Sequence, residues 1–224
     1  MNCNMKRLLF VILTLCVCIG LSAQAYWDAV RANKLFTFGI RGGIAFSKQY
    51  NTQKYYTMDL NHRLGFHLGV EVDWNVCRSL SANLGLKIIQ KGFKRDLSNE
   101  RISLKVNNNA TYLEIPVIAS YRIALSDAAQ FQLNVGPYFA YGLGGNYIVD
   151  FSDADDNVKD KTNSFDKYDG LRKFDFGLGY GCAITLSHLY FGVNYEHSLT
   201  KLGQDSRNGA QNSSIVISLG YNFN

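Results

Sequence analysis

The sequence has little proline, cysteine and histidine, and each shortage narrows the choice of fold and function. Only 2 of the 224 residues are proline, whereas 20 are glycine, 14 are tyrosine and 14 are phenylalanine. Aromatic residues favour strands, so the composition suits a β-rich fold. After residue 25 no stretch is apolar enough for a membrane-spanning helix, which needs about 20 residues. This absence does not exclude a membrane β-barrel, because barrel strands alternate apolar and polar residues and give a weak hydropathy signal.

The one long apolar run lies at the start of the chain and predicts a secretory signal peptide over residues 1–25. Lys6 and Arg7 precede an apolar run from Leu8 to Leu21, and small residues follow at Ala23-Gln24-Ala25. The run is too short for a membrane span of about 20 residues. Cleavage can follow Ala23 or Ala25. Residues 26–34 are then a periplasmic N-terminal tail, and residues 35–224 form the folded domain.

Few cysteines and few net charges remain after the signal peptide. Three of the five cysteines leave with it, so that Cys77 and Cys182 remain. We expect two free thiols, because Cys77 falls in a predicted turn and Cys182 in the middle of a predicted strand. The signal takes two of the 23 basic residues and none of the 18 acidic ones, which leaves a net charge of +3. Such a balance offers no electrostatic footprint for nucleic acid.

An alternating pattern organises the rest of the chain. In residues 112–123 every second residue from Leu113 to Ile123 is apolar, whereas the other set includes Glu114 and Arg122. Successive side chains of a strand point to opposite faces, and about 9–11 tilted residues span a bilayer. The pattern predicts eight strands, at residues 35–46, 64–76, 80–91, 112–123, 131–143, 173–186, 189–197 and 213–223. Pro116 and Pro137 fall inside two neighbouring strands, where we expect a bulge or a local irregularity.

The predicted connections alternate in length without exception. Residues 77–79, 124–130 and 187–188 are short, whereas residues 47–63, 92–110, 144–172 and 198–212 are long. Outer-membrane barrels have short periplasmic turns and longer external loops. The sequence therefore predicts an all-β, up-and-down, eight-stranded antiparallel transmembrane β-barrel with both termini in the periplasm.

Several short motifs resemble a family of small outer-membrane β-barrels, called porin-family or PorT-like. They are Phe38-Gly39-Ile40-Arg41-Gly42-Gly43, Gly65-Phe66-His67-Leu68-Gly69-Val70, Gln90-Lys91-Gly92, Tyr112-Leu113-Glu114-Ile115-Pro116, Val135-Gly136-Pro137-Tyr138 and Leu219-Gly220-Tyr221-Asn222-Phe223. The resemblance covers essentially all of the mature chain and implies an eight-stranded barrel in which the two prolines are habitual. One namesake group takes part in protein secretion across the outer membrane. None of the motifs is a catalytic signature, so no functional residue is carried over.

Charged residues gather on the inward set of the predicted strands. They are Arg41, Glu71, Asp73, Lys87, Glu114, Arg122, Asp175 and Glu196, joined by Lys91 if it also points inward. The interior of an eight-stranded barrel is just wide enough for side chains to fill it, and buried charges must be paired. We therefore favour a candidate interior charge network that plugs the barrel. A small passive or gated porin is the alternative reading of the same residues.

Catalysis and metal binding have little support. The only histidines are His62, His67, His188 and His197, and none is spaced to form a catalytic triad. Asp153, Asp155 and Asp156 form a candidate cation loop. Lysines close by in the sequence can neutralise these carboxylates, so we favour a solvated loop without a bound cation. We expect no enzyme, with a membrane-embedded lipid-modifying hydrolase as the remote alternative, and no cofactor or resident metal.

The expected role is therefore structural or binding. The predicted external loops are long, polar and rich in lysine and tyrosine, and loops on rigid scaffolds carry function. The expected partners are outer-membrane lipid and lipopolysaccharide, the barrel assembly machinery during insertion, and other envelope or secretion proteins.

Overall fold

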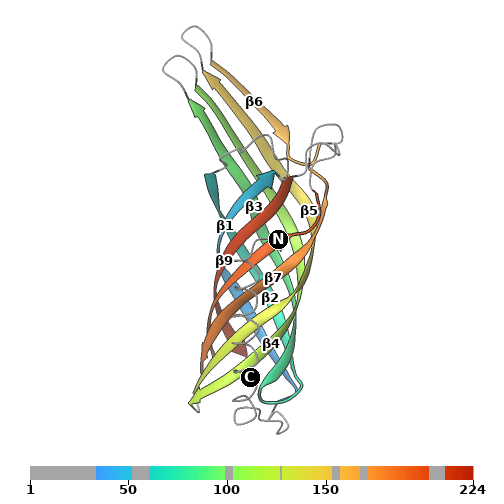
Figure 1. Cartoon of the computed structure of the whole chain (residues 1–224), viewed down its shortest axis with the longest axis vertical. Helices are drawn as coiled ribbons and strands as arrows, with labels where there is room; N and C mark the ends of the chain where they lie inside the picture. The colour runs from blue at the N-terminus through green and yellow to red at the C-terminus, as the bar shows by residue number, and fades with distance from the viewer. Residues whose placement is uncertain are drawn as a thin grey trace, which may run out of the picture.

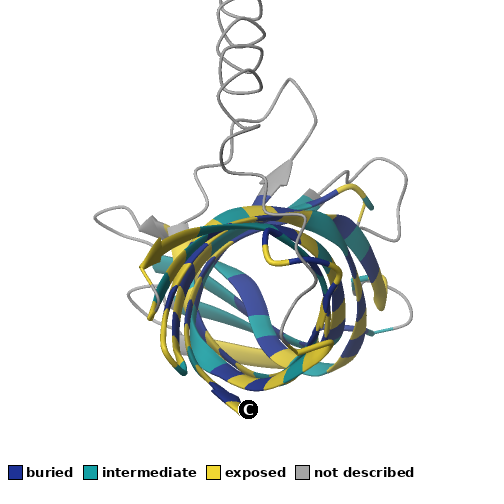
Figure 2. Ribbon diagram, turned by 90° about the horizontal axis from the view of Figure 1, so that it is seen from below, coloured by how far each residue is buried: buried dark blue, intermediate teal, exposed yellow. Residues whose placement is uncertain are grey.

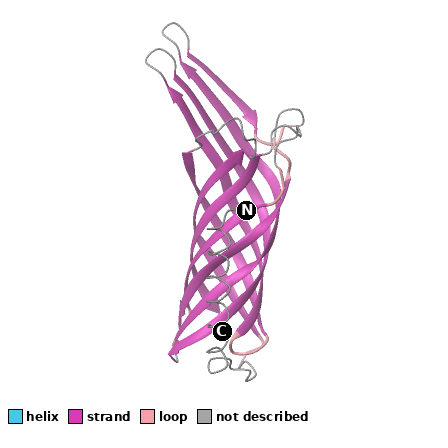
Figure 3. Cartoon of the chain, viewed as in Figure 1, coloured by secondary structure: helices cyan, strands magenta, loops and turns pink. Residues whose placement is uncertain are grey.

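The computed structural model describes residues 34–51, 61–98, 103–126, 128–152, 157–166, 171–201 and 210–223. Nearly all of them lie in strands (Figure 3). The strands are β1 (Phe36–Asn51), β2 (Asn61–Asn75), β3 (Leu80–Ser98), β4 (Ser103–Ser126), β5 (Ala129–Ser152), β6 (Asn157–Asn163), β7 (Phe174–Leu186), β8 (Leu189–Ser198) and β9 (Ala210–Phe223). The predicted signal peptide, the predicted N-terminal tail except residue 34, and the acidic triplet at 153–156 lie outside the described residues.

Eight of the nine strands close into a ring. The order is β1-β2-β3-β4-β5-β7-β8-β9, and β9 pairs with β1. Every neighbouring pair is antiparallel. Figure 1 shows the tilted wall from the side, and Figure 2 shows the ring from one end. The predicted eight-stranded antiparallel barrel is confirmed.

The tilt of the strands follows from how the ring closes. Walking across the pairings from Phe36 leads to Trp74, Ala82, Ala119, Val135, Tyr180, Tyr195, Ile215 and finally Phe46. The walk returns to β1 ten residues above its start, so the shear number is 10. At ordinary strand spacings, eight strands with this shear tilt by about 40° from the barrel axis.

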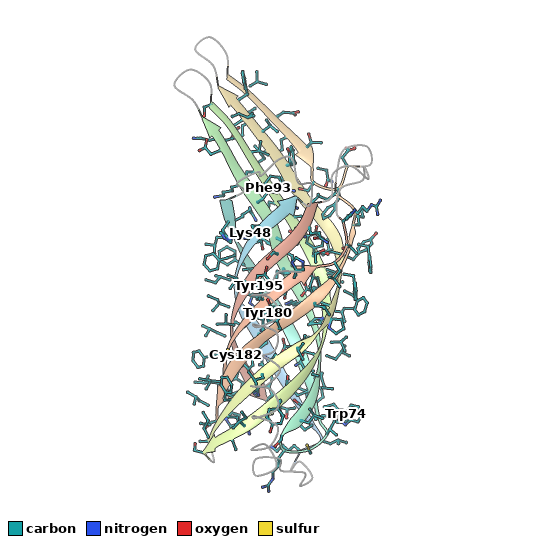
Figure 4. The ribbon with its side chains drawn as sticks, in the orientation of Figure 1. Lys48, Trp74, Phe93, Tyr180, Cys182 and Tyr195 are labelled. Carbon is teal, nitrogen blue, oxygen red and sulfur yellow. The ribbon has the colours of Figure 1, made fainter. Side chains whose placement is uncertain are left out.

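The outer wall carries an apolar band. On β1 the band runs from Phe36 to Phe46 and ends at Lys48, and its height at that tilt is about 25 Å, as outer-membrane barrels require. Trp74 lies near one end of the wall and Lys48 near the other (Figure 4). The exposed apolar side chains of the wall include Phe66, Leu68, Val70, Leu84, Val135, Tyr180 and Leu219. The described residues contain no helix long and apolar enough to cross a membrane.

Three connections lie at one end of the barrel, which we name the turn end. They join β2 to β3, β4 to β5, and β7 to β8, and β1 begins and β9 ends there as well (Figure 1). Cys77 and Cys182 are free thiols, as predicted. Cys77 is buried at the turn end, and Cys182 is exposed on the outer wall.

The opposite end departs from the prediction. Residues 92–110 and 144–172 were predicted to be external loops, but β3, β4 and β5 continue through much of them and β6 adds a further strand. The upper parts of β3, β4 and β5 (residues 92–98, 103–111 and 144–152) and β6 form a four-stranded sheet that projects beyond the barrel (Figure 1). We name this sheet the outer arm. The loop prediction was wrong because polar residues such as Asn107–Asn109 have low strand propensity, which pairing with neighbouring strands overrides.

The two prolines disturb the sheet without a bulge. Pairing of β3 with β4 lapses between Leu84 and Lys87, next to Pro116, and pairing of β4 with β5 lapses between Pro116 and Ala119, opposite Pro137. The register is the same on both sides of each lapse. The predicted irregularity is therefore confirmed, and it consists of two neighbouring gaps in the strand pairing. Gly85 accommodates the proline ring, because a Cβ there would lie 2.8 Å from Cγ of Pro116.

Because the ring is closed, we expect the fold to resist unfolding by detergent. An unheated sample in dodecyl sulfate should migrate faster on a gel than a boiled one, because a sheet without open edges stays compact in detergent. Identical mobility of a correctly inserted sample before and after boiling would count against the barrel.

Candidate functional site in the barrel interior

Four charged side chains cross the middle of the barrel. Lys87 Nζ lies 2.9 Å from Glu114 Oε1 and 2.6 Å from Glu196 Oε1. Lys91 Nζ lies 2.7 Å from Glu114 Oε2 and 2.9 Å from Glu196 Oε2. The two lysines come from β3 and the glutamates from β4 and β8. Because β3 and β8 are four places apart in either direction around the ring, these contacts join opposite walls. We name the four residues the ionic clamp.

The ionic clamp is almost completely removed from solvent. The exposed fractions of the side chains are 13% for Lys87, 1% for Lys91, 0% for Glu114 and 6% for Glu196. Each carboxylate contacts both ammonium groups, so two positive and two negative charges balance. Buried charges are tolerated when they are paired and hydrogen-bonded in this way. The arrangement spans the lumen from one wall to the other, and each of its four charges is paired.

A second charged group lies between the ionic clamp and the turn end. Arg41 Nε is 3.3 Å from Glu71 Oε2, and Arg41 Nη2 donates to Asn222 Oδ1 at 2.6 Å. The Arg41 guanidinium also lies 4.0 Å from the centre of the Tyr190 ring. These contacts link β1 to β2, β8 and β9, so one side chain connects four strands.

A third pair lies beside it. Arg122 Nη2 is 2.9 Å from Asp73 Oδ2, and Arg122 also donates to Asn75. Asn83 Nδ2 donates to Asp73 Oδ1 at 2.8 Å and to Glu71 Oε2 at 3.1 Å, which joins the second and third groups. Seven of the eight residues predicted to form an interior network therefore make ion pairs inside the barrel.

Asp175 is the exception. It is fully buried, but its carboxylate accepts hydrogen bonds from Ser198 Oγ at 2.5 Å, Thr200 Oγ1 at 2.9 Å and Asn212 Nδ2 at 3.2 Å. The expected ion pair is replaced by three neutral donors from β8, the residues after it, and β9. Such donors stabilise a carboxylate without a cation. Asp175 of β7 thereby links β8, Thr200 and β9 near the barrel mouth.

Buried aromatic and apolar side chains pack around the ionic clamp. Tyr112, Tyr138 and Ile89 are buried in the barrel interior, and Lys91 Nζ lies 4.2 Å from the centre of the Tyr138 ring. Phe165, which follows β6, meets Tyr112 edge-on with ring centres 5.4 Å apart. The period of two from Lys87 and Ile89 identifies Lys91 as inward-facing, whereas no local signal in the sequence identifies Phe165.

A polar cavity occupies the interior beside the charged groups. Its volume is about 50 Å³, and its lining includes Arg41, His67, Glu71, Lys87 and Tyr138. That volume holds a few water molecules and excludes an organic solute. The space left between the charged side chains of the interior is therefore large enough only for a few water molecules.

Three histidines of the described residues contact neighbouring aromatic rings, or a carbonyl oxygen and a hydroxyl group. The ring nitrogen Nε2 of His67 lies 3.2 Å from the Ile217 carbonyl oxygen and 3.3 Å from Ser218 Oγ, and neither partner is a carboxylate. The rings of His188 and His197 stack on Tyr221 and Tyr195. No group of three or more metal-ligating side chains occurs in the part of the chain that the structure describes. Asp153, Asp155 and Asp156, the predicted cation loop, lie outside that part.

The ionic clamp should dominate the stability of the barrel. Replacing Lys87 by Met leaves Glu196 and Glu114 with one ammonium partner instead of two, and a broken buried pair costs about 3–5 kcal/mol. Lys159→Met is the control, because it breaks the solvent-exposed contact with Asp150, worth about 0–1 kcal/mol. Urea unfolding in lipid vesicles measures both. Equal unfolding midpoints for the two variants would contradict the role of the clamp.

Comparison with known proteins agrees with this architecture. The family model for the outer membrane protein beta-barrel domain matches residues 23–204. No curated protein matches the chain. Three similar solved structures are Ail, the attachment invasion locus protein of Yersinia pestis (13% identity, TM-score 0.41, 85% of this chain and 100% of that chain covered), OprG from Pseudomonas aeruginosa (14%, 0.45, 87% and 99%) and Neisserial surface protein A (10%, 0.40, 83% and 97%).

The family match is the comparison that assigns the chain, because it spans most of its length. The likenesses to solved structures are too low to indicate a function. With a closed antiparallel ring and an apolar outer band already established, the chain belongs to the outer membrane protein beta-barrel domain family and is an integral protein of the bacterial outer membrane.

Proposed function

We propose that the protein is a non-conducting, non-enzymatic barrel that holds the outer arm at the cell surface for binding another envelope or secretion protein. Short turns of outer-membrane barrels lie in the periplasm, so the turn end and both ends of the barrel domain are assigned to the periplasm and the outer arm to the outside. The observation that carries the proposal is the outer arm, a strand-built surface with two unlike faces.

One face of the outer arm is charged. Asp96, Lys105, Asp150 and Lys159 follow one another across β3, β4, β5 and β6 in directly paired positions. Signs alternate along this row, and opposite charges on directly paired residues stabilise a sheet. Lys159 Nζ lies 3.4 Å from Asp150 Oδ1. This face keeps the arm soluble and ordered, and its lysines suit contact with lipopolysaccharide phosphates.

The other face has an apolar end, which is bordered nearer the barrel by Arg95 and Asp160, the partners of Val106 and Val149. Leu104 pairs with Phe151, which pairs with Val158, and Val106 pairs with Val149 one step closer to the barrel. These side chains are half-buried or exposed, and Val158 is 55% exposed. Contiguous apolar surface in water marks an interaction site. A partner protein with an apolar patch fits this face better than a small polar ligand does.

The interior supports the non-conducting part of the proposal. The ionic clamp joins opposite walls, Phe165 and Tyr112 cover it, and the cavity beside it holds only a few water molecules. In planar lipid bilayers the purified protein should give no discrete conductance steps. Steady, single-size steps from the unmodified protein would overturn this part and favour a small porin.

Binding is tested by affinity purification from gently solubilised outer membrane, read by mass spectrometry. Phe151→Ser removes the centre of the apolar face and should lose a stoichiometric protein partner. Asp150→Ser alters the adjacent residue on the opposite face and should keep it. Both variants should insert normally, since both residues lie beyond the barrel wall. Recovery of the unmodified barrel with lipopolysaccharide alone would remove the protein partner from the proposal.

A further inference from the structure

β6 continues directly into the residue that covers the barrel interior. Ser164 follows its last residue, and the Ser164 backbone N–H donates to the Gly145 carbonyl at 3.2 Å. Ser164 Oγ donates to Asn108 Oδ1 at 2.7 Å and lies 3.1 Å from the Asn109 carbonyl oxygen. These bonds turn the chain inward from the outer arm, so Phe165 enters the mouth of the barrel.

Phe165 occupies a fitted position. The residue is 8% exposed, and its ring meets Tyr112, which is fully buried. Gly142 lies against the ring, and a Cβ at Gly142 would be 2.3 Å from Cζ of Phe165. A residue other than glycine would displace the ring, so the β5 backbone leaves room for it. Phe165 therefore separates Tyr112 from the outside.

β6 is the least firmly held of the described strands. With seven residues it is the shortest, and it pairs only with β5. From Val158 to Asn163 all of its side chains are exposed. Its ion pair, Lys159 with Asp150, is exposed and spans 3.4 Å. Exposed pairs contribute little stability, and segments with few buried contacts open most readily.

We propose that β6 and Phe165 form one movable unit, in which separation of β6 from β5 withdraws Phe165 from the barrel mouth. The closed arrangement shields Tyr112 and the ionic clamp, and the open one exposes them to external water. A ligand shifts such an equilibrium when it binds one arrangement better than the other. A partner that holds β6 away from β5 would therefore open the mouth. This device goes beyond the proposed binding role and is measurable without any partner.

The plug is tested by thiol labelling of purified protein in detergent. Cys77→Ser and Cys182→Ser remove the native thiols, and Ala140→Cys places a probe on the buried inward face near Phe165. Adding Phe165→Ala should speed maleimide labelling of the probe by at least roughly 10-fold, since labelling tracks the open population. Val216→Cys is a second probe from the same buried cluster in case the first fails to fold. Unchanged labelling at both probes would refute the plug.

A matched probe distinguishes opening of the mouth from general loosening. Ala183 is also a buried inward alanine, but it pairs with Gln132 and Gly192, toward the turn end. Labelling of Ala183→Cys should stay unchanged when Phe165→Ala is added. Equal acceleration at both alanines would mean that the whole barrel has loosened, and it would overturn the proposal.

The link between β6 and the plug is tested by charge reversal. Lys159→Asp faces Asp150 across the strands and should speed labelling of Ala140→Cys about 2- to 5-fold, since like charges in directly paired positions destabilise a sheet. Lys161→Asp makes the same charge change on β6 but faces Ile148, and it should have no effect. Adding Asp150→Asn to Lys159→Asp removes the repulsion and should restore slow labelling, and it sets no like charge against Lys105. If Lys159→Asp has no effect while Phe165→Ala does, the plug is independent of β6 and the linkage is wrong.

Discussion

Charge pairing across a narrow, closed ring is the constraint on which the rest of the structure depends. Two lysines on β3 meet glutamates from β4 and β8, and β8 stands on the opposite wall. In an interior of low dielectric, each charge is costly until its partner is in place. The pairing therefore favours one register and one closure of the eight strands, because a slip of one residue would turn every charge toward lipid. Asp175 satisfies the same requirement with three neutral donors.

The sequence predicts the wall of the barrel well because the membrane enforces its pattern. From Phe36 to Phe46 on β1, and from Leu113 to Ile123 on β4, lipid selects apolar side chains at every second position. The inward charges then follow as the alternate set. Which of them meet is not predictable from one strand at a time. The contact of Lys87 with Glu196 joins residues 109 apart in the chain and exists only because the ring closes.

The outer arm and its plug escaped prediction for physical reasons. Above the apolar band no lipid selects the outward side chains, so residues such as Asn107 and Asn109 carry no strand pattern of their own. They are strands because β3 and β5 pair with them on both sides. Phe165 is one aromatic residue in a polar stretch, and its role depends on Gly142 and Tyr112, which come from two other strands. Neither relation leaves a trace in the local sequence.

The polarity of the sheet reverses at the edge of the apolar band. Inside the band, β4 turns Leu113 to lipid and Glu114 to the lumen, whereas in the outer arm it places Lys105 on the lipid side and Leu104 on the lumen side. Contact with water explains why Lys105 can replace an apolar residue on the outward face, because that face no longer contacts lipid above the band. Contact with water does not explain the apolar Leu104 on the lumen side, since solvent alone would favour polar residues on both faces. The proposed partner protein would supply the apolar contact that Leu104, Phe151 and Val158 lack, and β6 lies at the edge of that face, joined to Phe165. In this proposal, burial of the arm and the state of the barrel mouth are coupled through one strand.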